Sequence, residues 1–336
     1  MTLGLSQPGR TVIGLDVGTS RVVAIRDTSG QRVTRSELNA FLTLPWSGMT
    51  EASLKRESIP FLVQGGEILV IGNESARLAD LLGREVRRPM TRGMLNPEEP
   101  ESLALIRAIL RAVLEPEITA GAKVRFSVPS PPLQGEDSLT FHEAAVKQIL
   151  EDLGYPGAAG VNEGVAVVYS ELFETNYTGI GISCGGGLCN AALAYLSVPA
   201  LCFSIPKAGD FIDASAAAVA GEMATRVRLV KEQSFHFNGN YPDKVQQALA
   251  VYYDDMIQAV TAGLKQALQG CRSLPRIGRP LPVVLSGGGV LPEGFRDRFE
   301  RSLPEAGLPL PVSEVRMARR PLQATAEGVL AAALSE

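Results

Sequence analysis

Three glycine-centred turns interrupt this chain, and each follows a short run of apolar or β-branched residues. They are the turn 16–20 after the run 11–15, the turn 183–187 after the run 179–182, and the turn 286–289 after the run 281–285. A strand that ends in such a turn exposes backbone N–H groups, which favour phosphate oxygens. Three turns of this kind can converge on one phosphorylated ligand if the chain folds into two similar halves. The pattern therefore predicts nucleotide binding.

Apolar periodicity predicts strands and helices in alternation along the chain. The first half contains hairpins at 11–27 and 61–71, helices at 74–82, 103–113 and 136–153, and a strand at 124–128. The second half repeats this order with a hairpin at 179–196, a helix at 243–268 and a strand at 283–285. We expect Leu103 and Ile106 on the buried face of their helix. The alternation indicates an α/β fold, and the repetition indicates an approximate duplication.

The overall charge argues against a nucleic-acid partner. The 336 residues include 32 Lys and Arg against 36 Asp and Glu, a formal net charge of −4. Direct binding of a polyanion needs a basic footprint, which this composition does not supply. We therefore expect no direct contact with nucleic acid.

Signals for membranes, export and metals are few. No stretch reaches the roughly 18 apolar residues of a membrane span, and residues 1–10 lack the regions of a signal peptide, which predicts a cytoplasmic protein. The loop 41–49 carries the single tryptophan, Trp46. Membrane contact by this loop and a partly buried loop aromatic both stay open. Four cysteines without CxxC spacing and two histidines offer few zinc ligands.

The first turn can bind phosphate and a metal without either of the two common phosphate-binding motifs. The sequence contains no GxxxxGK[ST] and no GxGxxG after a strand. Asp16, at the end of a strand, is placed to hold a hydrated Mg²⁺ while Gly18, Thr19 and Ser20 contact phosphate oxygens. The alternative for Asp16 is a turn-forming residue.

The other two turns are glycine triplets. Residues Gly185, Gly186 and Gly187 permit close backbone approach to a second face of the same phosphates. Residues Gly287, Gly288 and Gly289 let an adenine and its ribose lie against the backbone. An ordinary loop is the alternative for each triplet taken alone.

The order of these turns resembles the actin, Hsp70 and sugar-kinase superfamily. The turns resemble its first phosphate, second phosphate and adenosine motifs, and residues 161–169 and 323–329 resemble its two connecting helices. Segments 87–93 and 207–213 are similar to those of MreB-type bacterial actins. The resemblance covers the whole chain. It implies a duplicated actin-like (ribonuclease H-like) α/β fold, with two domains around a nucleotide cleft.

The same resemblance implies a domain plan, cofactors and partners. Domain I is expected at 1–165 and 320–336 with a small subdomain IB at about 38–75, and domain II at 166–319 with a small subdomain IIB at about 205–265. ATP or ADP with Mg²⁺ is the implied cofactor, and the implied activity is slow ATP hydrolysis linked to assembly. The implied partner is the chain itself in a head-to-tail cytoskeletal filament, with bacterial adaptor proteins as further partners.

Two glutamates take roles by their position in the resemblance. Glu163 stands where the superfamily has the carboxylate that orients the attacking water, and its alternative is a glutamate favoured at a helix N-terminus. Glu232 matches a segment near the ribose, and its alternative is an exposed helix end.

The chain departs from the superfamily pattern at three places. Ser183 replaces the usual Asp before the second phosphate glycines, and Leu188-Cys189-Asn190 replaces a segment that usually ends in Asp. The loss removes an acid that supports Mg²⁺, which predicts slow hydrolysis. Gly164 replaces a proline, and we expect it to loosen the start of the connecting helix.

Three other functions stay open. A nucleotide-binding adaptor or scaffold that neither hydrolyses ATP nor polymerises is favoured by Ser183. A small-molecule kinase of the same superfamily would need an acid as base for the acceptor hydroxyl. The residues 181–185 also fit GxSxG, the nucleophile elbow of α/β hydrolases, with Asp210 or Asp213 and then His236 in the required order. That elbow needs a helix directly after the serine, whereas the sequence predicts a strand.

Overall fold

The computed structural model describes residues 11–135, 139–271, 274 and 277–336. Contacts divide the chain into two compact units. Unit 1 comprises Met1–Phe126, Ser138–Gly160 and Ala333–Glu336, and unit 2 comprises Ser127–Asp137 and Val161–Ala332. The expected domain and subdomain bounds stay a prediction, since compact units need not coincide with the domains of a superfamily. The residues 1–10 and the expected helix start at 136 lie outside the described residues.

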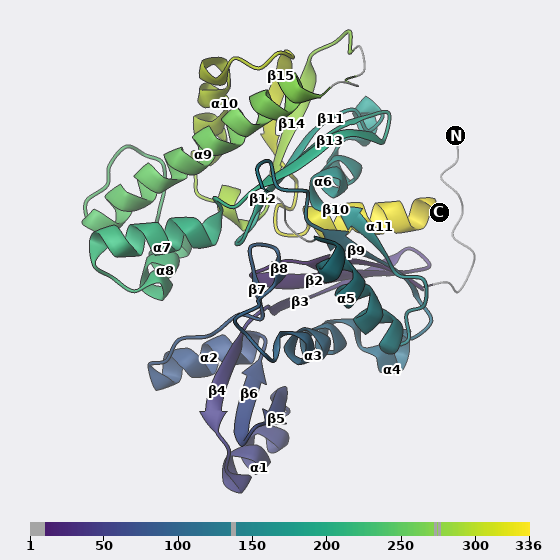
Figure 1. Cartoon of the computed structure of the whole chain (residues 1–336), viewed down its shortest axis with the longest axis vertical. Helices are drawn as coiled ribbons and strands as arrows, with labels where there is room; N and C mark the ends of the chain where they lie inside the picture. The colour runs from purple at the N-terminus through teal and green to yellow at the C-terminus, as the bar shows by residue number, and fades with distance from the viewer. Residues whose placement is uncertain (1–10, 136–138, 272–273, 275–276) are drawn as a thin grey trace. The chain divides into compact units, whose positions relative to one another are not determined.

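The large sheet of unit 1 has five strands in the order β10–β9–β1–β2–β3 (Figure 1). The bounds are Thr11–Val17 for β1, Arg21–Thr28 for β2, Gln31–Leu38 for β3, Lys123–Val128 for β9 and Ala159–Asn162 for β10. β1 and β2 form the predicted antiparallel hairpin, and β1 pairs in parallel with β9. The helices of this region are α3 (Ser102–Leu114), α4 (Pro116–Thr119) and α5 (Leu139–Asp152).

Burial explains the composition of these elements. β1 lies inside the sheet and is apolar on both faces, with Ile13 and Leu15 buried. β3 lies at the edge and is mostly exposed, and its charged side chains protect an edge strand from unwanted pairing. α3 buries Leu105 and Ile106 as an apolar stripe. The prediction for Leu103 was wrong: it is 47% exposed in the first turn of the helix, where Leu105 is buried instead.

Unit 1 also contains a small sheet with strand order β4–β6–β5. Its elements are β4 (Phe41–Pro45), α1 (Gly48–Arg56), β5 (Phe61–Gln64), β6 (Glu67–Ile71) and α2 (Asn73–Leu82). The predicted hairpin at 61–71 and the helix that follows it are therefore confirmed. A two-stranded ribbon of β7 (Met90–Thr91) and β8 (Met94–Leu95) leads from α2 toward α3.

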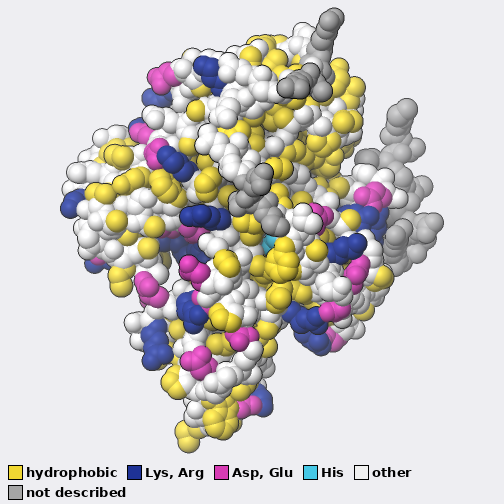
Figure 2. Space-filling model, viewed as in Figure 1, with side chains coloured by type: hydrophobic (Ala, Val, Ile, Leu, Met, Phe, Trp, Pro, Cys, Tyr) yellow, Lys and Arg dark blue, Asp and Glu magenta, His cyan; other side chains and the backbone are white. Residues whose placement is uncertain are grey.

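The tip of the small sheet is apolar. Hydrophobic side chains gather around α1 (Figure 2), where Met49 is 85% exposed. Trp46 is half exposed, and its Nε1 donates to Glu51 Oε2 at 2.9 Å. Membrane contact by this loop stays a prediction. In the described parts of the chain, no helix has the length and apolar character needed to cross a bilayer.

Unit 2 has a five-stranded sheet in the order β13–β12–β11–β14–β15 (Figure 1). The strands are β11 (Gly179–Cys184), β12 (Cys189–Tyr195), β13 (Val198–Ile205), β14 (Leu281–Ser286) and β15 (Val312–Met317). The helices are α6 (Glu163–Glu171), α7 (Gly209–Ala220), α8 (Ala224–Gln233), α9 (Lys244–Gly270), α10 (Phe295–Ala306) and α11 (Ala324–Ser335), with 3₁₀ turns η1 (Phe173–Thr175) and η2 (Gly288–Val290).

The two large sheets have the same topology. In each, an antiparallel meander of three strands starts next to a strand that pairs in parallel with its first member. β11 in unit 2 thus has the place of β1 in unit 1, and β14 has the place of β9. The duplicated α/β fold expected from the sequence is confirmed.

The two faces of the unit 2 sheet are covered differently. Ile182 and Leu193 belong to a core cluster that also contains apolar residues of α7, α9 and α10. The opposite face carries α6, against which α11 packs very closely: a Cβ on Gly328 would lie 1.7 Å from Ala166 O. The two predicted connecting helices are therefore packed backbone to backbone, which only glycine permits.

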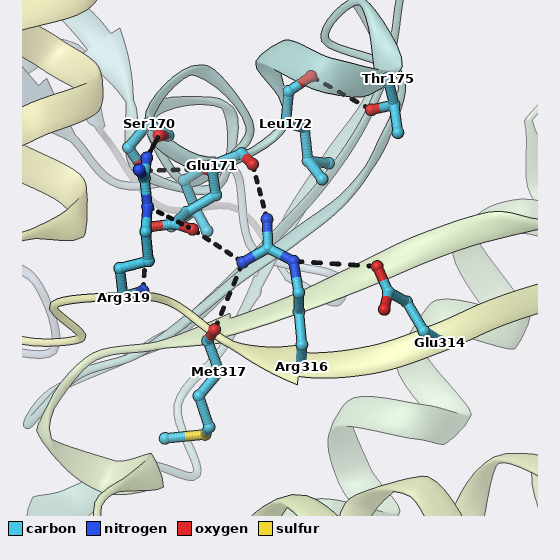
Figure 3. A network of polar contacts seen from close by, with 9 residues as sticks. Ser170, Glu171, Leu172, Thr175, Glu314, Arg316, Met317 and Arg319 are labelled. Atoms are coloured by element: carbon cyan, nitrogen blue, oxygen red, sulfur yellow. Dashed lines mark hydrogen bonds and ion pairs between the residues drawn. The ribbon is translucent and has the colours of Figure 1, made fainter.

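The C-terminal end of α6 is anchored by an arginine network (Figure 3). Glu171 is buried, and its carboxylate accepts from Arg316 Nη1 at 2.7 Å and from the backbone N–H of Arg319 at 3.0 Å. Arg316 Nη2 also donates to the carbonyl of Glu171 at 2.6 Å. Cations at a helix C-terminus complement its exposed carbonyl groups. The network joins α6 to β15 and to the chain that leads into α11.

Candidate functional site

The first turn follows β1 in unit 1 and is closed by backbone contacts. Gly18 N donates to Arg21 O at 3.1 Å, and a Cβ on Gly18 would lie only 2.8 Å from that oxygen. Asn39 holds the turn from outside, because its Nδ2 donates to Gly18 O at 2.9 Å and its N–H to Ser20 O at 3.0 Å. Asp16 is half-buried in β1, directly before the turn. Glycine at position 18 is thus required by close approach.

Side chains fasten the first turn to a second segment of unit 1. Thr19 is 5% exposed, and its Oγ1 accepts from Gly93 N at 2.9 Å. Ser20 Oγ accepts from Arg88 Nη1 at 2.9 Å. Arg88 and Gly93 belong to the segment 87–93 that resembles bacterial actins, but the sequence did not predict its contact with the turn. The structure therefore adds Arg88 and Asn39 to the surroundings of the first turn.

The middle turn caps a helix in unit 2. Gly185 N donates to Leu188 O at 2.9 Å and closes the hairpin between β11 and β12. The carbonyl of Gly185 accepts from Gly209 N at 3.1 Å, and that of Gly186 from Asp210 N at 2.8 Å. These two N–H groups begin α7, so the turn satisfies donors that a helix leaves without internal partners. The segment 207–213 is thereby placed against the glycine triplet.

The third turn lies against the middle turn. Gly287 has a φ of +90°, and a Cβ there would lie 2.3 Å from Cys184 O. A Cβ on Gly289 would lie 3.0 Å from the same oxygen, whereas one on Gly288 would meet only Leu322 at 3.6 Å. β11 and β14 are parallel neighbours that end together at this point. The structure thus brings two of the three predicted turns into direct contact.

Glu163 is the first residue of α6 and is held by two asparagines. Asn162 caps the helix, with its Oδ1 accepting from Gly164 N at 3.0 Å and Val165 N at 3.3 Å. Asn190 Nδ2 donates to Glu163 Oε2 at 2.8 Å. Glu163 thus lies beside the strand that leaves the middle turn.

Gly164 does not loosen the helix start, contrary to the sequence-based expectation. A Cβ at this position would lie 2.7 Å from Ala192 N. Gly164 therefore allows α6 to press against β12, while the Asn162 cap fixes the first turn of the helix.

Glu232 is less closely placed than expected. Its side chain is 60% exposed and lies 3.5 Å from Arg228 in α8. The preceding residue, Lys231, is buried instead: its Nζ lies 2.7 Å from Asp213 Oδ1 and 3.2 Å from Gly209 O. Burial raises the pKa of Asp213, and Lys231 opposes that shift. The sequence did not single out Lys231, which is the residue that connects α8 to the segment beneath the middle turn.

The hydrolase alternative does not fit this geometry. Ser183 lies within β11, and the chain returns after the turn as β12 rather than as a helix. His236, the expected base, has a half-exposed side chain that lies 3.9 Å from Glu293. The strand–elbow–helix arrangement that exposes a nucleophilic serine is therefore absent at Ser183.

Within the described residues, no group of three or more His, Cys, Asp or Glu side chains could together hold a metal ion. The first turn does offer oxygen atoms of the kind Mg²⁺ prefers. Asp16 supplies a carboxylate next to the turn, and Asn39 Oδ1 is buried without a hydrogen-bond partner among the described residues. This donor set fits a cation that keeps most of its ligands from water and phosphate.

Solved structures with the same fold are bacterial actin-like proteins. The MamK double helical filament is 17% identical, covers 96% of this chain and 98% of that chain, and has a TM-score of 0.66. MreB5 of Spiroplasma citri bound to ADP is 16% identical, covers 96% and 95%, and has a TM-score of 0.68. The ethanolamine utilization protein EutJ from Carboxydothermus hydrogenoformans is 16% identical, covers 96% and 90%, and has a TM-score of 0.56.

These likenesses show an actin-like fold of the MreB type, as the sequence resemblance implied. No curated protein sequence matches the chain. A sequence model of one family, Volactin, matches residues 11–333. Since this match spans nearly the whole chain, the protein belongs to the Volactin family.

Proposed function

We propose that this protein binds ATP, polymerises into cytoskeletal filaments and hydrolyses ATP slowly in connection with assembly. The observation that carries the proposal is the contact of the middle and third turns through Gly287 and Cys184. In open α/β sheets, ligands bind outside the carboxyl ends of the strands. β11 and β14 both end here, with Glu163 held beside β12.

The predicted site residues have distinct roles in this proposal. Residues Gly18, Thr19, Ser20, Ser183, Gly185, Gly186 and Gly187 contact phosphates, and Gly287, Gly288, Gly289 and Glu232 contact the nucleoside. Asp16 holds Mg²⁺, which when bound neutralises phosphate charge. Two relatives support a nucleotide ligand, since their titles describe MamK bound to AMPPNP and MreB5 bound to ADP.

Glu163 orients the water that attacks the terminal phosphate. Phosphoryl transfer depends on positioning and on charge neutralisation, so a fixed carboxylate suffices for this role. The hydrogen bond from Asn190 fixes one oxygen of that carboxylate at 2.8 Å. The neighbouring positions 183 and 190 hold a serine and an asparagine rather than acids, which is consistent with slow turnover.

Self-assembly is proposed from the fold. A relative with the same fold forms a double helical filament. Head-to-tail contacts are heterologous, and they propagate into open filaments when their rotation does not close a ring. The second candidate is an adaptor that binds ATP without hydrolysis or polymerisation. The neutral side chains of Ser183 and Asn190, both buried, favour this second candidate.

Glu163→Ala tests the enzymatic part of the proposal. We expect nearly unchanged ATP affinity, measured by calorimetry with AMPPNP, and a fall in phosphate release of about 100-fold or more at saturating ATP. Glu174→Ala is the matched control, because Glu174 is an exposed glutamate of unit 2 in η1. Unchanged phosphate release in Glu163→Ala would remove Glu163 from the mechanism.

A further inference from the structure

A row of neutral polar side chains crosses the sheet of unit 2 beside the middle turn. Ser286 of β14 pairs with Ser183 of β11, Ser183 pairs with Asn190 of β12, and Asn190 pairs with Ser204 of β13. All four residues are buried.

The row lies on the face of the sheet that carries α6. Side chains alternate between the two faces of a strand. Ile182 and Ala191, which adjoin Ser183 and Asn190 in sequence, belong to the core cluster on the α9 side. Asn190 contacts Glu163 of α6 on the other side. A buried row without acids therefore surrounds the start of the helix that bears Glu163.

The orientation of the Asn190 amide is determined by a backbone donor. Ser130 N donates to Asn190 Oδ1 at 2.7 Å. Because a backbone N–H can only donate, the atom facing it must be the amide oxygen. The amide NH₂ group is therefore the end that faces Glu163 Oε2.

We propose that Asn190 is a positioning residue for Glu163, with Ser130 fixing the amide that holds the carboxylate. The inference rests on the proposed function, in which Glu163 orients the attacking water. A 1% exposed amide with both ends hydrogen-bonded has little freedom to turn. It therefore presents the Glu163 carboxylate in one position.

Ser130 also ties down the helix that carries Glu163. Asn162 Nδ2 donates to Ser130 Oγ at 2.9 Å, and Asn162 caps α6. Ser204 Oγ donates to Ser130 O at 2.9 Å, which anchors Ser130 to β13. The backbone start of α6 and the side chain of Glu163 are thus referred to the same buried residue.

The neutral charge of Asn190 is essential to this role. An aspartate in its place would bring a second carboxylate within hydrogen-bond distance of Glu163. Two carboxylates this close cannot both ionise readily, so one of them retains a proton at a higher pH. The acid common at this position in the superfamily would therefore oppose the arrangement seen here.

Asn190→Asp and Asn190→Ala separate the two parts of the argument. We expect both variants to keep AMPPNP affinity and KM for ATP while kcat falls about 10- to 100-fold at neutral pH. In Asn190→Asp the rising limb of the pH–kcat profile should move to higher pH, and in Asn190→Ala it should not. Asn176→Asp, which adds the same charge at an exposed position of unit 2, is the matched control and should match the wild type.

A spectroscopic readout tests the contact without relying on turnover. The ¹³C resonance of the Glu163 carboxyl, assigned from its loss in Glu163→Gln, should titrate at higher pH in Asn190→Asp than in the wild type. An unchanged titration together with an unchanged pH profile would overturn the inference. If Glu163→Ala releases phosphate normally, the proposed function fails instead, and the titration still reports whether Asn190 holds Glu163.

Discussion

The first and middle turns occupy equivalent places in the duplicated fold, but they are held by different chemistry. In the first turn the hydroxyls of Thr19 and Ser20 accept hydrogen bonds from a neighbouring segment. In the middle turn the acceptors are the carbonyls of Gly185 and Gly186, which bond to the start of α7.

The difference shows what the duplication has kept. Both halves retain the strand, the glycine turn and the returning strand, since these depend on backbone geometry. The groups that fasten each turn have diverged. Substitutions that remove a side-chain acceptor should therefore affect the first turn, whereas an added Cβ should affect the junction of the middle and third turns.

The largest expected effect comes from Gly287→Ala at that junction. The new Cβ would lie 2.3 Å from Cys184 O at a φ of +90°. Steric overlap and an unfavourable backbone conformation together should lower the free energy of unfolding by about 4 kcal/mol, measured by urea denaturation. Gly288→Ala is the matched control, because its Cβ makes only an ordinary contact at 3.6 Å. Equal stability of the two variants would contradict the close approach.

Acid should distinguish the two units. Burial lowers the pKa of His142, in unit 1, to about 4, below the value of about 6.5 in an unfolded chain. The unfolded state then binds more protons between these values, so stability should fall by about 2 kcal/mol from pH 7 to pH 5. Burial raises the pKa of Asp213 in unit 2, so its contribution is lost as pH rises instead.

Urea denaturation at the two pH values measures this effect. His142→Gln should flatten the dependence, and His236→Gln, at a half-exposed position, should leave it unchanged. The same slope in wild type and His142→Gln would show that another group is responsible.

A smaller effect is expected at the first turn. Thr19→Val keeps the shape of the side chain but removes the acceptor for the buried N–H of Gly93. An unsatisfied buried donor should lower the free energy of unfolding by about 1 to 2 kcal/mol, measured by thermal or urea denaturation. Thr19→Ser retains the hydroxyl and should recover most of the hydrogen-bond contribution. If the two variants lose equal stability, the side-chain acceptor is not what holds this turn.

The sequence predicted the parts of the fold that depend on local pattern. Alternating strands and helices, the hairpins at both turns and the two connecting helices could be predicted because periodicity and glycine position are local properties. The contact between Gly287 and Cys184 joins residues far apart in sequence, and only the resemblance suggested that these turns meet.

The details of the site depended on tertiary packing. Lys231 and Glu232 are adjacent and both charged, and nothing in the sequence indicates that Lys231 is the buried one. Gly164 could be interpreted as a weak helix start until its close approach to Ala192 was known. Asn190 was seen as the loss of an acid, whereas its contact with Glu163 gives it a partner.

Light scattering with negative-stain microscopy tests the central proposal most directly. Purified protein should give filaments and increased scattering with ATP, and much less of both with ADP or without nucleotide. Binding of AMPPNP in calorimetry without filaments in any condition would contradict polymerisation and favour the adaptor. The absence of both binding and filaments would contradict the nucleotide site itself.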